Sequence, residues 1–401
     1  MKKYFLLLFV CCGVLLCKSQ EYSFVFQDIY PKDIEAGAER TPAYFPLIQG
    51  KKIALCVNQT SMVGNTHLLD TLLSSGMEIV KVFTPEHGFR GHSEAGKKVD
   101  NSIDPETKIP IISLYGNNKK PTAEQMKGID MVIFDIQDVG ARFYTYISTL
   151  HYIMEAAAEN GVKVLVLDRP NPNGFWVDGP VLDTAYRSFV GMHPVPIAHG
   201  MTVGEYAKMI NGEGWLAGKK KCELAIVAVF GYAHFFRYQL PINPSPNLSS
   251  MEAVYLYPSL CLFEGTPMSI GRGTDKPFRI LGHPNFPEGN ITFTPMNMPG
   301  ITTNPPCVGQ KCKGFDLSDM ASIIMKSNNF ININLIVEAY KEFPQKDSFF
   351  TPFFDKLAGT KTLREQIIAG KTIDEIKQSW QHNLNAFKQI RKKYLLYPDF
   401  E

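Results

Sequence analysis

The stretch MVIFDIQDVGARFYTYISTLHYIMEAAAENGVKVLVLDRPNP, residues 131–172, decides the fold. It begins with the apolar run 131–135, continues with an amphipathic segment that ends at Gly161, and returns to an apolar run at 163–167. A short strand, a helix closed by a glycine and a second short strand are typical of a βαβ unit, whose two strands lie parallel in one sheet. The stretch therefore predicts an α/β protein built on a parallel sheet.

The same alternation continues towards the N-terminus. Apolar runs at 52–57, 78–83 and 109–114 are strand candidates, and the segments at 66–75 and 121–127 are helix candidates. Five strands with intervening helices indicate a Rossmann-like architecture in the topological sense.

Two domains are expected, because 401 residues exceed what one hydrophobic core usually holds. The Pro- and Asn-rich segment 169–180 marks the boundary. We predict a Rossmann-like catalytic domain over residues 20–180 and a smaller α+β C-terminal domain over residues 181–401 that completes the cleft. The second domain is expected to contain a helix at 202–210, a strand at 223–230, an ordered site-building loop at 241–314, and helices at 363–369 and 372–390.

The N-terminal residues indicate export. Lys2 and Lys3 precede an apolar run at 4–16, which is too short to span a bilayer and is typical of a secretory signal peptide. We place cleavage after Ser19, so that residues 1–19 are the signal peptide, no integral membrane segment remains, and the mature protein is periplasmic or secreted. A lipoprotein signal ending at Cys17 is the weaker alternative, because Leu16 stands where a small residue is expected.

The five cysteines that follow the signal are too few and odd in number for a complete disulfide framework. Cys307 and Cys312 are close enough in sequence for a local bridge, and two free thiols are the equal alternative.

Composition and motifs exclude several classes of partner. The formal charge is +2 without long runs of one sign, which argues against nucleic acid. The first strand is followed by Asn-Gln-Thr-Ser at 58–61 where a dinucleotide site needs Gly-x-Gly-x-x-Gly, and the chain has no P-loop. No cofactor is therefore expected.

Polar side chains follow the second, fourth and fifth predicted strands at the points where those strands end. Ligands bind beyond the carboxyl ends of strands in an open parallel sheet. We therefore expect a functional cleft there, to which these ends bring Glu86, His87, Asp135, Asp138, Arg142, Tyr144, Asp168 and Arg169.

Carboxylates beside arginine and tyrosine suit glycoside cleavage. That reaction needs a carboxylic acid to protonate the leaving oxygen, and Glu86, set among Pro85, Gly88 and Phe89, is the best candidate. The anomeric centre is then stabilised by Asp135 or Asp138, or by an acetamido group of the substrate.

Metal-assisted hydrolysis is the competing mechanism. His87 and His92 invite it, but their spacing places them on no common helix or strand face and the chain has no HExxH motif, so no metal is expected.

The second domain offers two further candidates. His199 precedes a predicted capping box at Thr202 and Glu205, and we expect it to contact the ligand. Arg272, flanked by two glycines, suits a planar anion such as a carboxylate, with pairing to Glu264 or Asp275 as the structural alternative.

At this point the motifs carry a family resemblance. The chain from about residue 51 to its end resembles the bacterial exo-β-N-acetylmuramidase family of NamZ type. The matching motifs are PEHGFRG at 85–91, DIQDVGARFYTY at 135–146, LDRPNP at 167–172, FEGT at 263–266, GRGT at 271–274 and FDKLAGT at 354–360.

The resemblance implies an exo-acting glycosidase that releases N-acetylmuramic acid from the non-reducing ends of peptidoglycan fragments. It implies Glu86 as the catalytic residue, with Asp135, Asp138, Arg142, Tyr144, Glu264 and Arg272 as supporting or substrate-binding positions. To the substrate-binding positions we add His87 and His199 from their places after a strand and before a helix. An arginine, Arg272 before Arg142, is expected to bind the lactyl carboxylate. The alternatives are a metal-dependent hydrolase and a noncatalytic periplasmic sugar-binding protein, and the stereochemical outcome stays open.

Overall fold

The computed structural model describes residues 33–89, 101–326 and 331–401. The expected signal peptide at 1–19, with Cys17, lies outside the described residues. Arg90 and Gly91 of the first family-like motif, and His92, also lie outside them.

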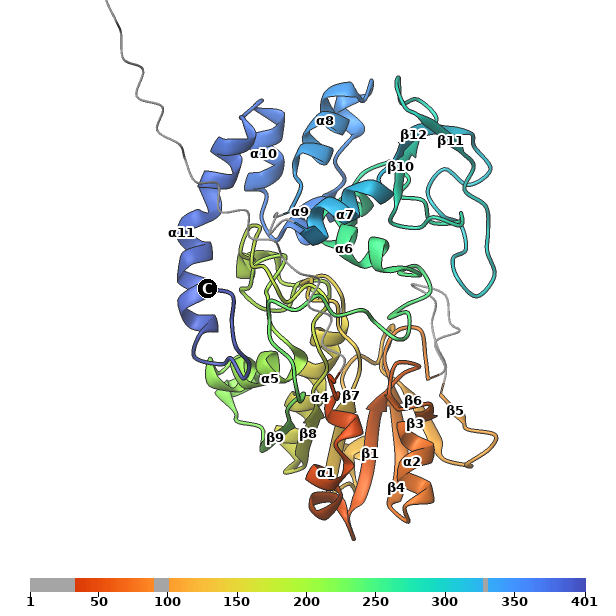
Figure 1. The fold of residues 1–401 in the computed structure, drawn as a ribbon, viewed down its shortest axis with the longest axis vertical. Coiled ribbons are helices and arrows are strands. Elements are labelled where there is room, and N and C mark those ends of the chain that lie inside the picture. Colours follow the sequence, from red (N-terminus) through yellow and green to blue (C-terminus); the bar gives the residue numbers. More distant parts are fainter. Residues whose placement is uncertain (1–32, 90–100, 327–330) are drawn as a thin grey trace, which may run out of the picture.

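A seven-stranded sheet forms the lower part of the molecule in Figure 1. Its strands are β1 (Lys52–Val57), β4 (Glu78–Thr84), β5 (Ser102–Ile103), β6 (Pro110–Ser113), β7 (Met131–Asp135), β8 (Lys163–Leu167) and β9 (Leu224–Val227). They are arranged in the order β5-β6-β4-β1-β7-β8-β9, and all except the antiparallel edge strand β5 run parallel. The six parallel strands have the 3-2-1-4-5-6 order of a Rossmann fold, so the predicted fold class is confirmed.

Each face of the sheet has its own hydrophobic core, because alternate residues of a strand point to opposite faces. In β1, Ile53 and Leu55 belong to one core while Ala54 and Cys56 belong to the other. Helices α1 (Thr41–Ile48) and α2 (Leu68–Ser74) pack on the first face, and α4 (Tyr146–Asn160) and α5 (Val203–Gly212) pack on the second. Burial on both faces explains why these strands are nearly continuous apolar runs.

Local signals place several helix ends where we expected them. Helix α4 ends at Gly161, which has the left-handed φ of 67° that glycine adopts without strain. Helix α5 begins with the predicted capping box, in which Thr202 and Glu205 exchange side-chain-to-backbone hydrogen bonds. The segment 66–75 differs, because strand β3 (Thr66–His67) pairs with β2 (Met62–Val63) before α2 begins.

The sheet does not end at residue 180, where we expected the first domain to end. Strand β9 pairs in parallel with β8, from Val164 with Leu224 to Leu167 with Val227, and α5 packs on the same sheet. The segment after residue 180 therefore supplies a further helix and strand to the Rossmann-like unit.

The C-terminal part contains more regular structure than its sequence indicated. The expected loop at 241–314 includes α6 (Met251–Leu260) and the strands β10 (Ile280–His283), β11 (Ile291–Phe293) and the start of β12 (Cys312–Asp316), which form an antiparallel sheet. Helix α6 is buried from Ala253 to Leu260, so it lacks the polar face that makes a helix visible in sequence. Helices α7 (Ser318–Lys326), α8 (Asn334–Glu342), α9 (Pro352–Ala358), α10 (Thr362–Ile368) and α11 (Ile373–Arg391) complete this part.

The remaining elements are short. They are η1 (Gly37–Glu39), β2 (Met62–Val63), β3 (Thr66–His67), α3 (Ala123–Met126), η2 (Thr184–Tyr186), η3 (Ala217–Lys219), η4 (Cys261–Gly265) and η5 (Lys346–Ser348). None of the described helices combines the length and apolar character that a membrane span requires. Cys307 and Cys312 are free thiols.

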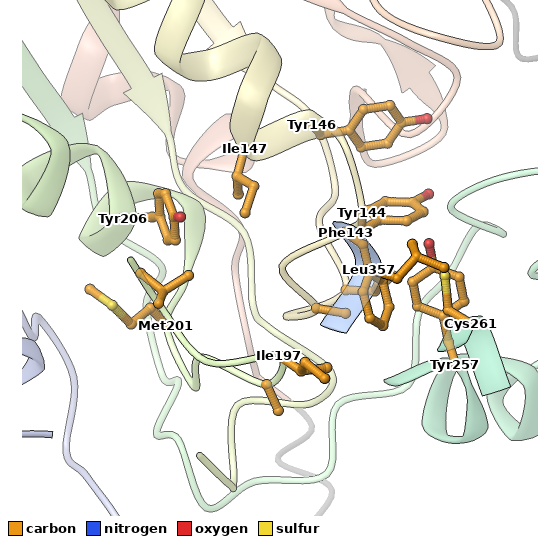
Figure 2. Close-up of a cluster of buried hydrophobic side chains, with 14 of the residues drawn as sticks. Phe143, Tyr144, Tyr146, Ile147, Ile197, Met201, Tyr206, Tyr257, Cys261 and Leu357 are labelled. Atoms are coloured by element: carbon orange, nitrogen blue, oxygen red, sulfur yellow. The ribbon is translucent and has the colours of Figure 1, made fainter. Parts of the chain in front are cut away.

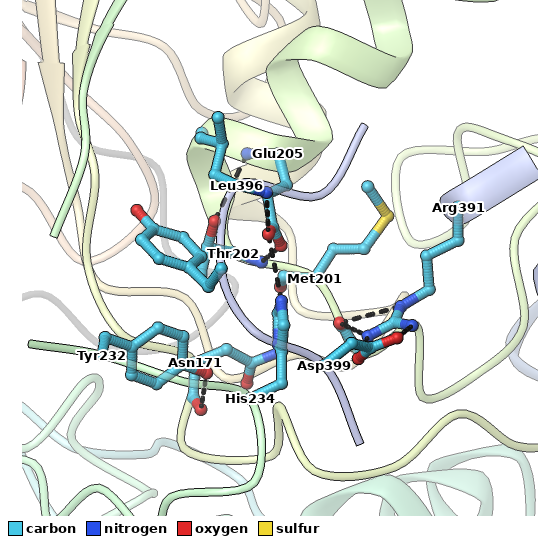
Figure 3. A network of polar contacts seen from close by, with 12 residues as sticks. Asn171, Met201, Thr202, Glu205, Tyr232, His234, Arg391, Leu396 and Asp399 are labelled. Atoms are coloured by element: carbon cyan, nitrogen blue, oxygen red, sulfur yellow. Dashed lines mark hydrogen bonds and ion pairs between the residues drawn. The ribbon is translucent and has the colours of Figure 1, made fainter. Parts of the chain in front are cut away.

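The C-terminal tail after α11 returns to the Rossmann-like unit beside α5 (Figure 1). The Tyr397 hydroxyl donates to Asp168 at 2.5 Å, and the backbone N–H of Leu396 donates to Glu205 at 2.8 Å. Arg391 binds both Asp399 and the carbonyl of Gly200 in the network drawn in Figure 3. These buried polar contacts fix the last helix against the sheet.

Candidate active site

A cavity of about 520 Å³ lies beyond the carboxyl ends of the parallel strands, between the sheet and the C-terminal part. Loops after β4, β6 and β7 supply one side of it, and the segments around α6, η4 and α9 supply the other. A cavity of this size, lined by aromatic side chains and a few polar groups, suits a small ligand such as a monosaccharide. Its lining includes Glu86, His87, Tyr115, Lys119, Tyr144, Thr145, Tyr146, Phe189, Ser245, Asn247, Tyr257, Glu264, Arg272 and Phe278.

Glu86 reaches the cavity from a tight turn that follows β4. His87 and Gly88 have φ values of 71° and 75°, and the Gly88 N–H donates to the Pro85 carbonyl at 3.1 Å. A left-handed backbone at a histidine is uncommon and costs conformational energy, which the surrounding structure must offset. The turn places Glu86 and His87 side by side in the lining, as we expected from the strand end.

Two hydroxyl groups contact the Glu86 carboxyl. The Thr145 hydroxyl lies 3.3 Å from Glu86 Oε2, and the Tyr115 side chain donates a hydrogen bond to the same carboxyl. Burial and the neighbouring Glu86 together raise the pKa of Tyr115, so this phenol remains a proton donor. The two donors orient the carboxyl group towards the cavity.

Aromatic rings form one wall of the cavity. The Tyr144 ring centroid lies 4.8 Å from that of Tyr146 and 5.7 Å from that of Tyr257, each in an edge-on arrangement. Figure 2 shows the hydroxyl groups of Tyr144 and Tyr146 pointing to the same side. Burial raises the pKa of Tyr144 well above its ordinary value, so the wall combines apolar surface with neutral hydroxyl groups. Such a wall matches the apolar and hydroxyl faces of a pyranose ring.

The C-terminal part contributes an ion pair. Arg272 binds Glu264 Oε1 through Nε at 2.9 Å and through a terminal nitrogen at 2.5 Å, and its guanidinium lies 4.9 Å from the Phe278 ring centroid. Both residues line the cavity as predicted, but the pairing is the structural alternative that we had considered for Arg272. Gly271 and Gly273 allow close packing on the protein's own carbonyls of Lys276 and Met296, rather than on a ligand.

The two aspartates that we expected to support catalysis do not line the cavity. Asp135 is fully buried, and its two carboxylate oxygens bind the Arg169 guanidinium at 2.6 and 2.9 Å. Asp138 is buried and accepts from the Gly140 N–H at 2.7 Å, and burial raises its pKa to about 7. Both side chains are therefore held by contacts within the protein and do not face the cavity.

Arg142 and His199 are also placed away from the lining. The guanidinium of Arg142 is fully buried and donates to the carbonyls of Pro180, Val195 and Leu357, rather than to an aspartate of its own segment. His199 packs on Tyr206 with its Nε2 3.8 Å from Asp138, and burial lowers its pKa to about 3, so it is neutral.

The end of β8 likewise turns away from the cavity. Asp168 accepts hydrogen bonds from Thr202, Gly204 and Tyr397, and Arg169 is held by Asp135. Of the three strand ends that we expected to meet at the cavity, those of β4 and β7 do so, with Glu86 following β4 and Tyr144 following β7. The residues after β8 do not line the cavity.

Sequence reasoning missed the loop after β6. Tyr115 and Lys119 line the cavity from this loop, which follows a strand that the sequence did predict. Ligands bind beyond the ends of parallel strands, and β6 is the third predicted strand, so the same rule applied to its end would have identified both residues.

The competing hypothesis of metal-assisted hydrolysis requires a cluster of metal-binding side chains. Among residues 33–89, 101–326 and 331–401, no group of three or more His, Cys, Asp or Glu side chains is arranged to hold a metal ion.

Comparisons with known proteins cover most of the chain. Residues 53–252 match the N-terminal family model of exo-β-N-acetylmuramidase NamZ, and residues 255–397 match its C-terminal model. The peptidoglycan β-N-acetylmuramidase NamZ of Bacillus subtilis (strain 168) is 39% identical over 377 residues, which cover 89% of each chain.

Two solved structures of DUF1343 family proteins from Bacteroides fragilis NCTC 9343 are also similar. The first is 49% identical with a TM-score of 0.85, covering 92% of this chain and 99% of that one. The second is 29% identical with a TM-score of 0.79, covering 91% of this chain and 99% of that one.

Proposed function

Because this chain belongs to the exo-β-N-acetylmuramidase NamZ family, we propose that it releases N-acetylmuramic acid from the non-reducing ends of peptidoglycan fragments, with Glu86 as general acid. The family membership makes the protein a peptidoglycan glycosidase, in agreement with the resemblance of its motifs. It also sets aside a noncatalytic sugar-binding protein. The exo-acting release and the role of Glu86 are our proposal.

One observation carries the assignment of Glu86. Of the three carboxylates that the sequence offered as catalytic, Glu86 lines the cavity, whereas Asp135 and Asp138 are buried in contacts within the protein. The Thr145 and Tyr115 hydroxyl groups hold its carboxyl group in place. A general acid must lie within hydrogen-bond reach of the leaving oxygen, which a cavity-lining carboxyl satisfies.

The proposed reaction begins when Glu86 donates its proton to the glycosidic oxygen as the bond between that oxygen and the anomeric carbon breaks. The acetamido carbonyl oxygen of the muramic acid attacks the anomeric carbon from the opposite face and neutralises its developing charge. The Glu86 carboxylate then removes a proton from water, whose oxygen attacks the anomeric carbon and restores the acetamido group.

Acetamido participation is favoured over a second carboxylate by the described lining. Glu86 and Glu264 are the carboxylates among the described lining residues, and Glu264 is bound to Arg272. We expect the first-formed anomer to retain its configuration, as observed by proton NMR. An inverted first product would exclude acetamido participation and return the choice to a protein carboxylate.

The test of Glu86 uses the Glu86→Gln variant, which keeps the shape and removes the transferable proton. Loss of a general acid costs about 10²- to 10⁴-fold in rate. We expect a loss of at least about 100-fold in kcat on the disaccharide N-acetylmuramyl-N-acetylglucosamine. The loss should be at least about tenfold smaller on a dinitrophenyl muramide, because that leaving group departs without protonation.

The matched control is Glu124→Gln, which changes an exposed glutamate of α3 (Ala123–Met126) and should leave both rates unchanged. If Glu86→Gln lowers the rate on both substrates by the same factor, Glu86 acts in binding or folding. If the variant retains more than a tenth of the wild-type rate on the disaccharide, Glu86 is not the general acid.

We also propose that residues 1–19 are a cleaved signal peptide and that the mature protein acts in the periplasm or outside the cell. The support is the basic start and the apolar run at 4–16. N-terminal sequencing of protein from fractionated cells should begin at Gln20. A cytoplasmic protein that begins at Met1 would refute this proposal, and a lipidated Cys17 would replace it with a lipoprotein.

A further inference from the structure

We propose that Lys119 binds the lactyl carboxylate of muramic acid and so sets the selectivity of the cavity for muramic acid over N-acetylglucosamine. The inference rests on the proposed function, because the carboxylate belongs to its substrate. The two sugars differ by this acidic ether, so a selective site needs a cation that is free to pair with it.

Lys119 lies on the same loop as the residue that contacts the proposed acid. The loop is anchored where it leaves β6, since the Leu114 N–H donates to the Thr84 carbonyl at 2.8 Å and the Asn118 amide donates to the Ser113 carbonyl at 3.0 Å. Tyr115 then contacts Glu86, and Lys119 follows four residues later in the lining. One anchored loop thus positions both residues relative to a bound sugar.

An aromatic ring holds the ammonium group at the edge of the cavity, where Lys119 and Phe189 also border a neighbouring pocket. Lys119 Nζ lies 4.6 Å from the centroid of Phe189, which also lines the cavity. Phe189 stacks on Tyr152, and its carbonyl accepts a hydrogen bond from Ser148 of α4 at 2.7 Å. A cation on an aromatic face is attracted by the ring but keeps its full charge and its N–H donors for another partner.

The other candidate cations among the described residues already have partners. Arg272 forms two hydrogen bonds with Glu264, and the guanidinium of Arg142 donates to three backbone carbonyls outside the lining. Lys120, the next residue along the chain, pairs with Glu155 and Glu159. Within the described part of the chain, no carboxylate pairs with Lys119.

The charges of the lining match a monoanion. The Glu264–Arg272 pair is neutral in sum, and in the reactive form of the proposed enzyme Glu86 carries the proton that it donates, so in that form neither carboxylate of the described lining offsets the charge of Lys119. A carboxylate that enters the cavity loses water, and a preplaced ammonium offsets that cost. A sugar without the carboxylate leaves the ammonium unpaired.

The test measures binding and turnover in the full-length mature protein. The variants are Lys119→Met, Lys119→Arg and the matched control Lys127→Met, which removes an exposed lysine outside the lining. Calorimetry gives the Kd for N-acetylmuramic acid, its lactyl carboxamide and N-acetylglucosamine. The carboxamide keeps the shape of the lactyl group without its charge. Thermal midpoints confirm that each variant is folded.

We expect Lys119→Met to weaken binding of N-acetylmuramic acid by at least about tenfold, as for a lost charge-assisted hydrogen bond, and to change the other two ligands by less than about threefold. Lys119→Arg should retain most of the affinity. In turnover, the ratio of kcat/KM for aryl muramide over aryl glucosaminide should fall by a similar factor.

Three results would overturn the assignment. They are an unchanged affinity of Lys119→Met for N-acetylmuramic acid, an equal loss for all three ligands, and a collapse of selectivity in Arg272→Met that Lys119→Met does not share. Failure of the proposed function is separate, because a protein that binds N-acetylmuramic acid through Lys119 without hydrolysing muramides supports this inference and refutes the glycosidase reaction.

Discussion

Replacement of Arg142 by methionine should destabilise the protein strongly and leave its sugar selectivity unchanged. Its guanidinium is fully buried and donates to the carbonyls of Pro180, Val195 and Leu357 at 2.8, 2.7 and 2.8 Å. Leu357 lies in the last turn of α9, where helix carbonyls have no partner within the helix. Arg142 thus joins the loop after β7 to two neighbouring loops and to the C-terminal part.

The magnitude follows from these three bonds. A hydrogen bond to a charged group contributes about 1.5–3 kcal/mol, and the methionine fills the volume of the arginine stem while leaving three buried carbonyls without their donor. Allowing for non-additivity, we expect the free energy of unfolding to fall by at least about 3 kcal/mol.

Urea denaturation measures this change, with Arg364→Met as the matched control. Arg364 also makes two hydrogen bonds, to Asp355, but it is only half-buried, with 30% of its side chain exposed, so we expect its removal to cost less than that of the fully buried Arg142. A loss below about 1 kcal/mol for Arg142→Met would refute the structural role. A loss of selectivity for muramic acid in folded Arg142→Met would restore the sequence-based expectation that this arginine binds the lactyl carboxylate.

Three further predictions concern pH, the C-terminal tail and metal. Burial raises the folded-state pKa of Asp138 to about 7, above its unfolded value of about 3.9, so the folded state binds the extra proton and the free energy of unfolding falls as pH rises from about 4 to 7. Asp138→Asn should flatten this slope in urea titrations, and an unchanged slope would contradict the assignment. The control Asp316→Asn changes a carboxyl with a pKa of about 2 and should leave the slope as it is. Tyr397→Phe should lower the free energy of unfolding by about 1–3 kcal/mol, because it removes the hydrogen bonds to Asp168 and Val229. The control is Tyr394→Phe, at a more exposed tyrosine that donates to Glu213. If Tyr397→Phe costs no more than this control, the C-terminal tail does not fix the last helix to the sheet. Activity should survive EDTA and dialysis, and a loss that zinc or manganese restores would favour metal-assisted hydrolysis.

Much of the fold could be predicted from local sequence. The strands β7 and β8 have the bounds that their apolar runs indicate, and Gly161 ends α4 as a left-handed residue. Burial on both faces of a parallel sheet makes such strands continuous apolar runs, and a glycine terminator acts within one turn. The capping boxes at Thr202 and Thr372 are equally local, and both are present.

Elements without a local signal escaped prediction. Helix α6 is buried all round and β10 to β12 are short, so neither shows the periodicity on which sequence reasoning depends. The sheet membership of β9 depends on pairing with β8 across sixty residues of chain, as in Val164 with Leu224, and no local pattern encodes that pairing.

The candidate site divides in the same way. The sequence by itself determined that Glu86 and His87 follow a strand at the ligand-binding edge, because the strand and the polar residues after it are adjacent in the chain. Only the tertiary structure decided that Asp135 turns inwards to Arg169, that Arg272 meets Glu264, and that Lys119 remains available on Phe189. The interaction energy of two charges depends on the distance between them, and for segments far apart in sequence only the folded chain sets that distance.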